Sequence, residues 1–141
     1  MPKLLLHILV FSAFLASCST QKKIVTDSKG NPIPEITWEV QKFDLGDVYL
    51  GDTRDLEYTF TNTGSADLEI ELVTTCKCTA IDWPRQPIPP GGIGKITATY
   101  DSTNQKLGPI TKTIDIIANT DPIVVEAFFD VNVLYRNNYK K

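Results

Sequence analysis

Histidine and methionine are almost absent from this chain of 141 residues. The single histidine, His7, and the single methionine, Met1, both lie in a first segment that we predict to be removed. A mature chain without histidine lacks the commonest general base and the commonest metal ligand of proteins. No pair of acidic residues occupies a recognisable hydrolase motif either. We therefore expect a protein that is not an enzyme and that holds no cofactor.

An excess of positive charge is also missing. The formal net charge is -3, and the lysines are scattered rather than clustered. This distribution lacks the basic patch that nucleic acids and anionic lipid headgroups require. Hydrophobic residues make up 42% and charged residues 22% of the chain, which is typical of one globular domain. We expect no nucleic-acid partner.

No apolar run is long enough for a transmembrane helix, which needs about 20 residues. The run Leu4–Phe14 follows the basic Lys3 and has the length of a secretory signal core. It ends in Leu-Ala-Ser-Cys at 15–18, which resembles the lipobox of bacterial lipoproteins. That resemblance implies a signal peptide over 1–17 and acylation of the thiol of Cys18. A chance cysteine after an ordinary signal peptide is the alternative.

The lipobox also implies a location in the cell. Ser19 replaces the aspartate that resembles an inner-membrane retention signal, so we expect a lipid anchor in the outer membrane of the bacterial cell envelope, facing the periplasm. Residues 18–34 are polar and rich in turn formers, and they are predicted to be the lipidated N-terminus and a flexible linker.

No stretch after residue 35 has a helical period. Apolar and polar residues alternate instead, as they do in strands with one buried face. Six or seven short strands over 35–135 predict an all-β, immunoglobulin-like antiparallel β-sandwich, followed by a polar tail over 136–141. Turn residues such as Leu45-Gly46-Asp47 and Asn62-Thr63-Gly64 separate the strands. The alternation is clearest over Ile36–Val40, Leu56–Phe60, Leu68–Leu72, Ile96–Tyr100, Ile114–Ile116 and Val125–Val133.

Acidic side chains indicate how these strands are distributed. Two successive strands carry acids on the polar face, at 55 and 57 in the first and at 67, 69 and 71 in the second. Pairing them would oppose like charges, so we expect the two strands in different sheets. The first and last strands, Ile36–Gln41 and Ile123–Leu134, are expected at sheet edges.

Two cysteines, Cys76 and Cys78, remain free if Cys18 is acylated. On an extended strand their Cα atoms would be roughly 6.6 Å apart with both side chains on the inward face, alongside Leu68 and Leu72. Disulfides need Cα separations of about 4.4–6.8 Å and converging Cβ atoms, so a local disulfide requires a bend in the chain. Three interpretations stay open: buried free thiols, a local disulfide, or a site for a soft metal such as Cu(I).

The stretch Trp83–Gly92 combines an indole with four prolines. Rigid prolines beside a large aromatic ring lose little entropy on binding. We predict a partner surface formed by Trp83, Pro84, Pro87 and Pro89. A rigid connection between two strands is the alternative.

Several short motifs then occur in order, namely Phe-Asp-Leu-Gly at 43–46, Phe-Thr-Asn-Thr-Gly at 60–64, Cys-Lys-Cys-Thr at 76–79 and Trp-Pro at 83–84. In this order they resemble the bacterial family known as domain of unknown function fifteen-seventy-three, over about residues 36 to 134. The resemblance implies an immunoglobulin-type sandwich of the ASH and major-sperm-protein kind, whose members serve mainly as binding modules. That family usually has Cys-Gly-Cys where this chain has Lys77 between the cysteines.

Together these features predict a monomeric, lipid-anchored envelope protein whose sandwich is a structural module or binds an unidentified envelope protein. The alternative is a periplasmic Cu(I)-handling protein that uses Cys76 and Cys78.

Overall fold

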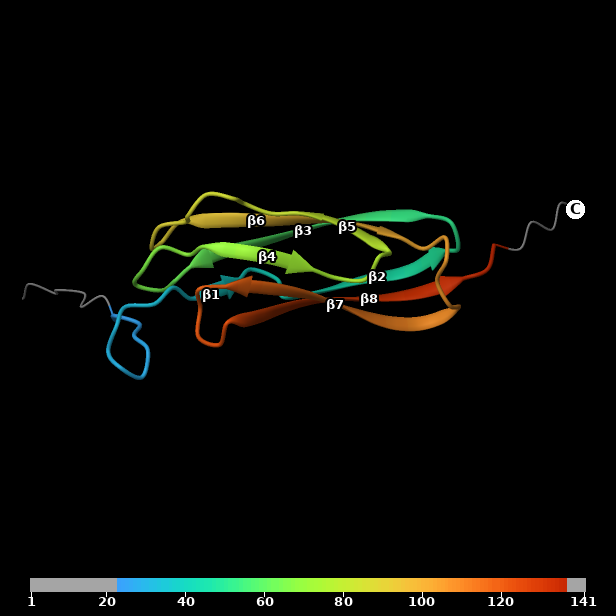
Figure 1. Cartoon of the computed structure of the whole chain (residues 1–141). Coiled ribbons are helices and arrows are strands. Elements are labelled where there is room, and N and C mark those ends of the chain that lie inside the picture. Colours follow the sequence, from blue (N-terminus) through green and yellow to red (C-terminus); the bar gives the residue numbers. More distant parts are fainter. Residues whose placement is uncertain (1–22, 137–141) are drawn as a thin grey trace, which may run out of the picture.

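The computed structural model describes residues 23–136, which form two four-stranded sheets packed face to face (Figure 1). The strand orders are β1-β3-β6-β5 and β2-β8-β7-β4. The described chain begins at one end of the sandwich and leaves at the other (Figure 1). The strands are β1 (Ile36–Trp38), β2 (Lys42–Tyr49), β3 (Thr53–Asn62), β4 (Ile70–Thr74), β5 (Thr79–Asp82), β6 (Ile93–Asp101), β7 (Gly108–Ala118) and β8 (Val124–Leu134).

The all-β, immunoglobulin-like sandwich is confirmed, with eight strands over residues 23–136 instead of six or seven. The two strands that alternation did not reveal are β2 and β5. An irregularity between Asp44 and Asp47 breaks the period of β2, and β5 has only four residues, too few to show one. Between residues 23 and 136, no helix has the length and apolarity needed to cross a membrane.

The core lies between the sheets and is built from the alternating apolar residues. Tyr58 and Phe60 of β3, Tyr100 of β6 and Phe129 of β8 are all fully buried. The Tyr58 hydroxyl donates to the carbonyl oxygen of Phe128 at 2.8 Å, which links the two sheets. Burial raises the pKa of this phenol. The predicted inward faces of β3, β6 and β8 are therefore confirmed.

The separation of the acidic strands is confirmed as well, because β3 and β4 belong to different sheets. β3 pairs with β6, which carries threonine and lysine side chains next to the acids of β3. The Lys95 ammonium lies 2.6 Å from a Glu57 carboxylate oxygen, and the Thr99 hydroxyl donates to Asp55 at 2.7 Å. The polar face of this sheet is thus free of opposed like charges along β3.

The prediction for sheet edges is half right. β1 is an edge strand, but β8 lies inside its sheet between β7 and β2. β2 pairs with β8 in parallel, so the sandwich is not wholly antiparallel. The prediction failed because β2, which the alternation pattern did not reveal, pairs with the side of β8 that would otherwise be free.

Two local irregularities change which side chains face the core. Leu45-Gly46-Asp47 is not a turn between strands but a register shift inside β2. A second shift, between Ile70 and Leu72, reverses the phase of β4, so that Leu72 is 47% exposed and Val73 is buried. The predicted inward face from Leu68 to Cys78 therefore ends before Leu72, since each inserted residue turns the following side chains to the other face.

The second half of the predicted linker is held against the sandwich. The Ile33 amide donates to the Val25 carbonyl at 3.1 Å, and the Val25 amide donates to the Ser65 hydroxyl at 2.7 Å. Gly64 lies under this segment, where a Cβ atom would overlap the backbone of residues 33–35. Part of the stretch predicted as a flexible linker is therefore packed on the domain.

Candidate functional site

Cys18 lies outside the described residues, as do the predicted signal peptide and nearly all of the polar tail. The lipid anchor thus stays a prediction. Cys76, Cys78 and the Trp83 stretch all lie within the described part of the chain.

Cys76 and Cys78 form a disulfide, with their Cα atoms 5.2 Å apart. The chain bends between β4 and β5, where the Thr79 amide donates to the Cys76 carbonyl at 3.1 Å and closes a tight turn around Lys77. No residue of this turn has a positive φ, so lysine fits at position 77, where the family that the sequence resembles usually has glycine. Of the three interpretations, the structure shows the local disulfide rather than two free thiols in the core.

This disulfide stabilises the fold less than a bond between distant residues would. Chain entropy predicts a stabilisation of about 1.6 kcal/mol for a loop of three residues, compared with about 3 kcal/mol for a loop of 15. It also joins neighbouring residues instead of connecting the two sheets. The bond is therefore no substitute for the inter-sheet disulfide of antibody domains.

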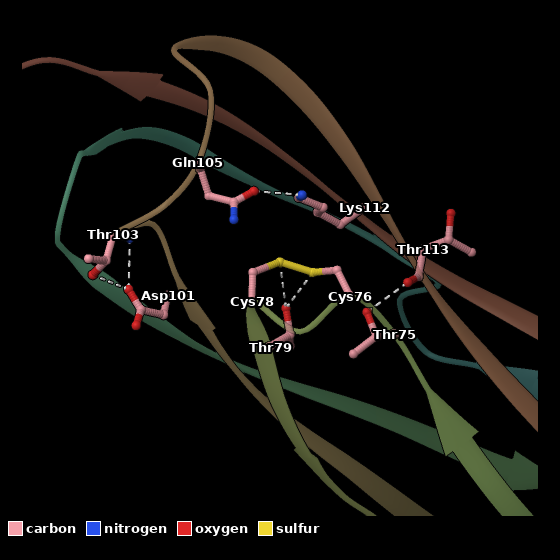
Figure 2. The surroundings of a disulfide bond; sticks show 9 residues. All are labelled: Thr75, Cys76, Cys78, Thr79, Asp101, Thr103, Gln105, Lys112 and Thr113. Carbon is pink, nitrogen blue, oxygen red and sulfur yellow. Dashed lines mark hydrogen bonds between the residues drawn. A yellow bond between two sulfur atoms is a disulfide. The ribbon is translucent and has the colours of Figure 1, made fainter.

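The surroundings of the disulfide are polar on one side and apolar on the other. Cys78 packs against the core, while both cysteines remain partly exposed. The Thr79 hydroxyl oxygen lies 3.5 Å from the Cys76 sulfur and 3.7 Å from the Cys78 sulfur, and this threonine is only 8% exposed. Figure 2 shows the hydroxyl pointing at both sulfurs from the side opposite Gln105 and Lys112.

A hollow of about 180 Å³ opens beside Cys78. The Thr103 hydroxyl and amide donate to the Asp101 carboxylate there, which lowers the pKa of Asp101. The Lys112 ammonium donates to the Gln105 side-chain oxygen at 2.7 Å. The hollow is lined by Lys77, Cys78, Asp101, Asn104 and Gln105.

The soft-metal alternative finds no support in this geometry. The sulfurs of Cys76 and Cys78 are bonded to each other, and Cu(I) requires thiolates. Between residues 23 and 136 no three histidine, cysteine, aspartate or glutamate side chains gather as potential metal ligands.

The predicted partner surface follows β5, one of the two edge strands of its sheet. The Arg85 guanidinium stacks over the Trp83 ring, 3.3 Å from its centroid, and pairs with Asp82 at 3.5 Å. The Trp83 side chain also packs against the core, so it is only partly exposed. Pro84 is also partly buried, whereas Pro87 and Pro89 are exposed. We call Trp83, Pro84, Arg85, Pro87 and Pro89 the Trp83 surface.

Sequence reasoning missed Arg85 as part of this surface. A single arginine after a Trp-Pro pair carries no periodic or motif signal, and only the fold of the connection brings its guanidinium over the indole. Stacked arginine and tryptophan are the residue types that dominate binding energy at protein interfaces.

Asn62 is a second residue that the sequence did not single out, because Asn-Thr-Gly is typical of a turn. It is fully buried at the end of β3. Its side-chain oxygen accepts from the amides of Glu35 at 3.3 Å and Gly64 at 3.0 Å. Its side-chain amide donates to the carbonyl oxygens of Ala66 and Ile88, each at 2.8 Å. Asn62 thus joins the end of β3 to the segment just before β1 and to the connection that carries the Trp83 surface.

Comparison with solved structures shows the same fold in other proteins. A protein of unknown function from Porphyromonas gingivalis W83 is 22% identical with a TM-score of 0.60, and the match covers 72% of this chain and 46% of that one. The ASH/PapD-like domain 7 of human CEP192 is 12% identical with a TM-score of 0.57, and it matches over 96% of this chain and all of that domain.

The secreted serine protease VesC from Vibrio cholerae is 19% identical with a TM-score of 0.56, over 70% of this chain but 23% of its own length. The chain therefore spans less than half of the Porphyromonas protein and about a quarter of VesC. At these identities the likeness concerns the fold. No curated protein sequence matches the chain.

The family comparison is more specific. The sequence model of the family "Protein of unknown function (DUF1573)" matches residues 36–133, from the first residue of β1 to the penultimate residue of β8. Because this match takes in both sheets, the disulfide and the Trp83 surface, the chain belongs to the DUF1573 family.

Proposed function

We propose that this protein is a lipid-anchored envelope lipoprotein, held by Cys18 in the outer membrane, whose sandwich binds another envelope protein without catalysis. One observation carries the binding role, namely the stacked Trp83 and Arg85 directly after the edge strand β5. An edge strand offers unpaired backbone groups to an added strand. The neighbouring aromatic and arginine side chains can supply the specificity that backbone pairing lacks.

The fold comparisons support this proposal at the level of architecture. The ASH/PapD-like domain of human CEP192 matches the chain over nearly its whole length. The match to VesC covers only 23% of that protease, so it does not support a catalytic role for this chain. The proposed partner is a periplasmic or outer-membrane protein within reach of the anchored sandwich.

Arg85→Ala is expected to weaken partner binding by about tenfold, the effect of losing a stacked arginine worth about 1.4 kcal/mol at an interface. Arg85 is exposed, so the fold should be unaffected. The partner is first captured in cells by a photo-crosslinking residue at the exposed Gln86, and affinity is then measured with the purified pair. Asp55→Ala, on the exposed acidic face of β3, is the matched control and should bind normally.

Trp83→Ala should weaken binding further, but it also removes a ring that packs against the core. Its thermal stability must therefore be measured alongside its affinity. Equal affinities for the Arg85→Ala and Asp55→Ala variants would contradict the Trp83 surface, as would recovery of only lipids and abundant porins at position 86.

Cys18→Ala is expected to abolish acylation and leave uncleaved precursor, because the cysteine supplies the thiol that is lipidated. Intact-mass measurement of membrane fractions distinguishes the two forms. The double variant Cys76→Ala/Cys78→Ala is the control and should keep the lipid mass. An unmodified N-terminus at or after Cys18 in the unaltered protein would show that there is no anchor.

A further inference from the structure

The Cys76–Cys78 disulfide joins neighbouring residues and does not connect distant segments of the fold. It closes a loop of only three residues, so it restricts the unfolded chain less than a bond between distant segments would. It also lies at the protein surface with both residues partly exposed. A disulfide that joins neighbouring residues and stays accessible can be reduced and re-formed without separating distant segments of the fold.

The buried hydroxyl of Thr79 gives this bond a chemical environment of its own. This oxygen lies within hydrogen-bonding distance of both sulfurs. Whichever sulfur becomes a thiolate, the same hydroxyl can donate to it, and hydrogen bonding to the charged form favours that form.

The position of the disulfide makes it available to a soluble partner. β6 runs from the connection beside Asn62 to Asp101, whose amide donates to the Cys78 carbonyl at 2.8 Å. Eight residue steps of about 3.3 Å therefore place the disulfide about 26 Å from the end of the sandwich where the chain from the predicted anchor arrives. The hollow of about 180 Å³ beside Cys78 leaves room for an incoming thiol.

We propose that Cys76 and Cys78 form a thiol–disulfide exchange site whose substrates are proteins that carry two reduced cysteines. A substrate thiolate attacks the Cys78 sulfur through the hollow. A bond forms between these two sulfurs while the Cys76–Cys78 bond breaks, and its electron pair remains on Cys76 as a thiolate that accepts from the Thr79 hydroxyl.

The second substrate thiolate then attacks the substrate sulfur of the mixed disulfide. This step forms the substrate disulfide and releases Cys78 as a thiolate beside Thr79. The two protons of the substrate thiols end on Cys76 and Cys78, so the substrate is oxidised by two electrons and this protein is reduced by two. Reduced glutathione, as two molecules, can replace the substrate dithiol.

The test uses the full chain, purified oxidised and mixed with reduced glutathione at neutral pH. Opening of the disulfide is followed by alkylation and mass measurement, and folding by circular dichroism. We expect a gain of two hydrogens with reduced glutathione, and their loss again when oxidised glutathione is added, while the β-sheet signal stays unchanged. Thr79→Val keeps the shape of the side chain without its hydroxyl, and it should slow reduction on the order of fivefold, the effect of one lost hydrogen bond.

Thr75→Val is the matched control, since the Thr75 hydroxyl donates to the Thr113 carbonyl at 2.8 Å and makes no hydrogen bond to either sulfur of the disulfide. It should be reduced at the unaltered rate. A disulfide that opens only when the sheet signal is lost would overturn the exchange site, and so would equal rates for the Thr79→Val and Thr75→Val variants. Neither outcome bears on the Trp83 surface, whose test measures partner affinity.

Discussion

Asn62→Ala is expected to lower the free energy of unfolding by roughly 3–5 kcal/mol, a large effect for a polar residue. The change leaves four buried or partly buried backbone groups without the partner that Asn62 now provides. Each buried group left unsatisfied costs about 1–3 kcal/mol, reduced where water can reach it. Urea unfolding followed by circular dichroism measures the loss.

Asn119→Ala is the matched control, because Asn119 makes similar bonds at the surface. Its side-chain oxygen accepts from the Glu69 amide at 2.8 Å, and its side-chain amide donates to the Asp67 carbonyl at 3.0 Å. Water can replace these bonds at an exposed site, so the expected loss is about 1 kcal/mol or less. Equal shifts of the urea midpoint for the two variants would show that Asn62 is not a buried structural centre.

Asn62→Ala should also loosen the connection that carries the Trp83 surface. Asn62 holds the Ile88 carbonyl, and its own backbone carbonyl accepts from the Gly91 amide at 2.7 Å. Hydrogen exchange should therefore accelerate at Ile88 and Gly91 more than at Ile114 in the other sheet. Stability and the shape of the proposed binding surface depend on the same side chain.

Phe60→Ala is expected to cost about 3–5 kcal/mol through the cavity that it leaves in the core. The Phe60 ring is fully buried and meets the Trp38 ring edge to face, with centroids 5.4 Å apart. It also covers Gly94 of β6, where a Cβ atom would overlap the ring. Neighbouring side chains therefore cannot fill the space from that side.

Thr97→Ala serves as the control for Phe60→Ala, since Thr97 is exposed on the neighbouring strand β6. Its expected cost is about 1 kcal/mol or less, the range of strand propensities. Midpoints in urea that shift equally for both variants would contradict the assignment of Phe60 to the inward face and Thr97 to the outward face of this sheet.

Much of the fold could be predicted because alternation is a local property of the sequence. Leu56, Tyr58 and Phe60 alternate with polar residues, and this pattern alone places them on a buried face. Pairing of β3 with β4 would have opposed acids such as Asp55 and Glu69, so the sequence also favoured placing these two strands in different sheets. The sandwich, its inward faces in β3, β6 and β8 and the separation of the acidic strands followed from neighbouring residues.

The failures share a physical cause, which is that pairing and register depend on residues far apart in the chain. One inserted residue near Leu72 turns it to the solvent, and no local pattern marks the insertion. β8 lies inside its sheet only because β2 returns to pair with it across more than 80 residues. The edge prediction for β8 failed for that reason. The prediction for β1 held because, among the described strands, β1 pairs only with β3.

The sequence by itself determined the class of fold, the candidate residues at Cys76, Cys78 and Trp83, and the prediction of an anchor at Cys18. Only the tertiary structure decided what the described candidates are. The bend before Thr79 converts two cysteines into a disulfide, and folding of the connection after β5 brings Arg85 over Trp83. Asn62 resembles an ordinary turn residue until four backbone groups converge on it, because a hydrogen-bond network exists only when distant segments of the chain are brought together.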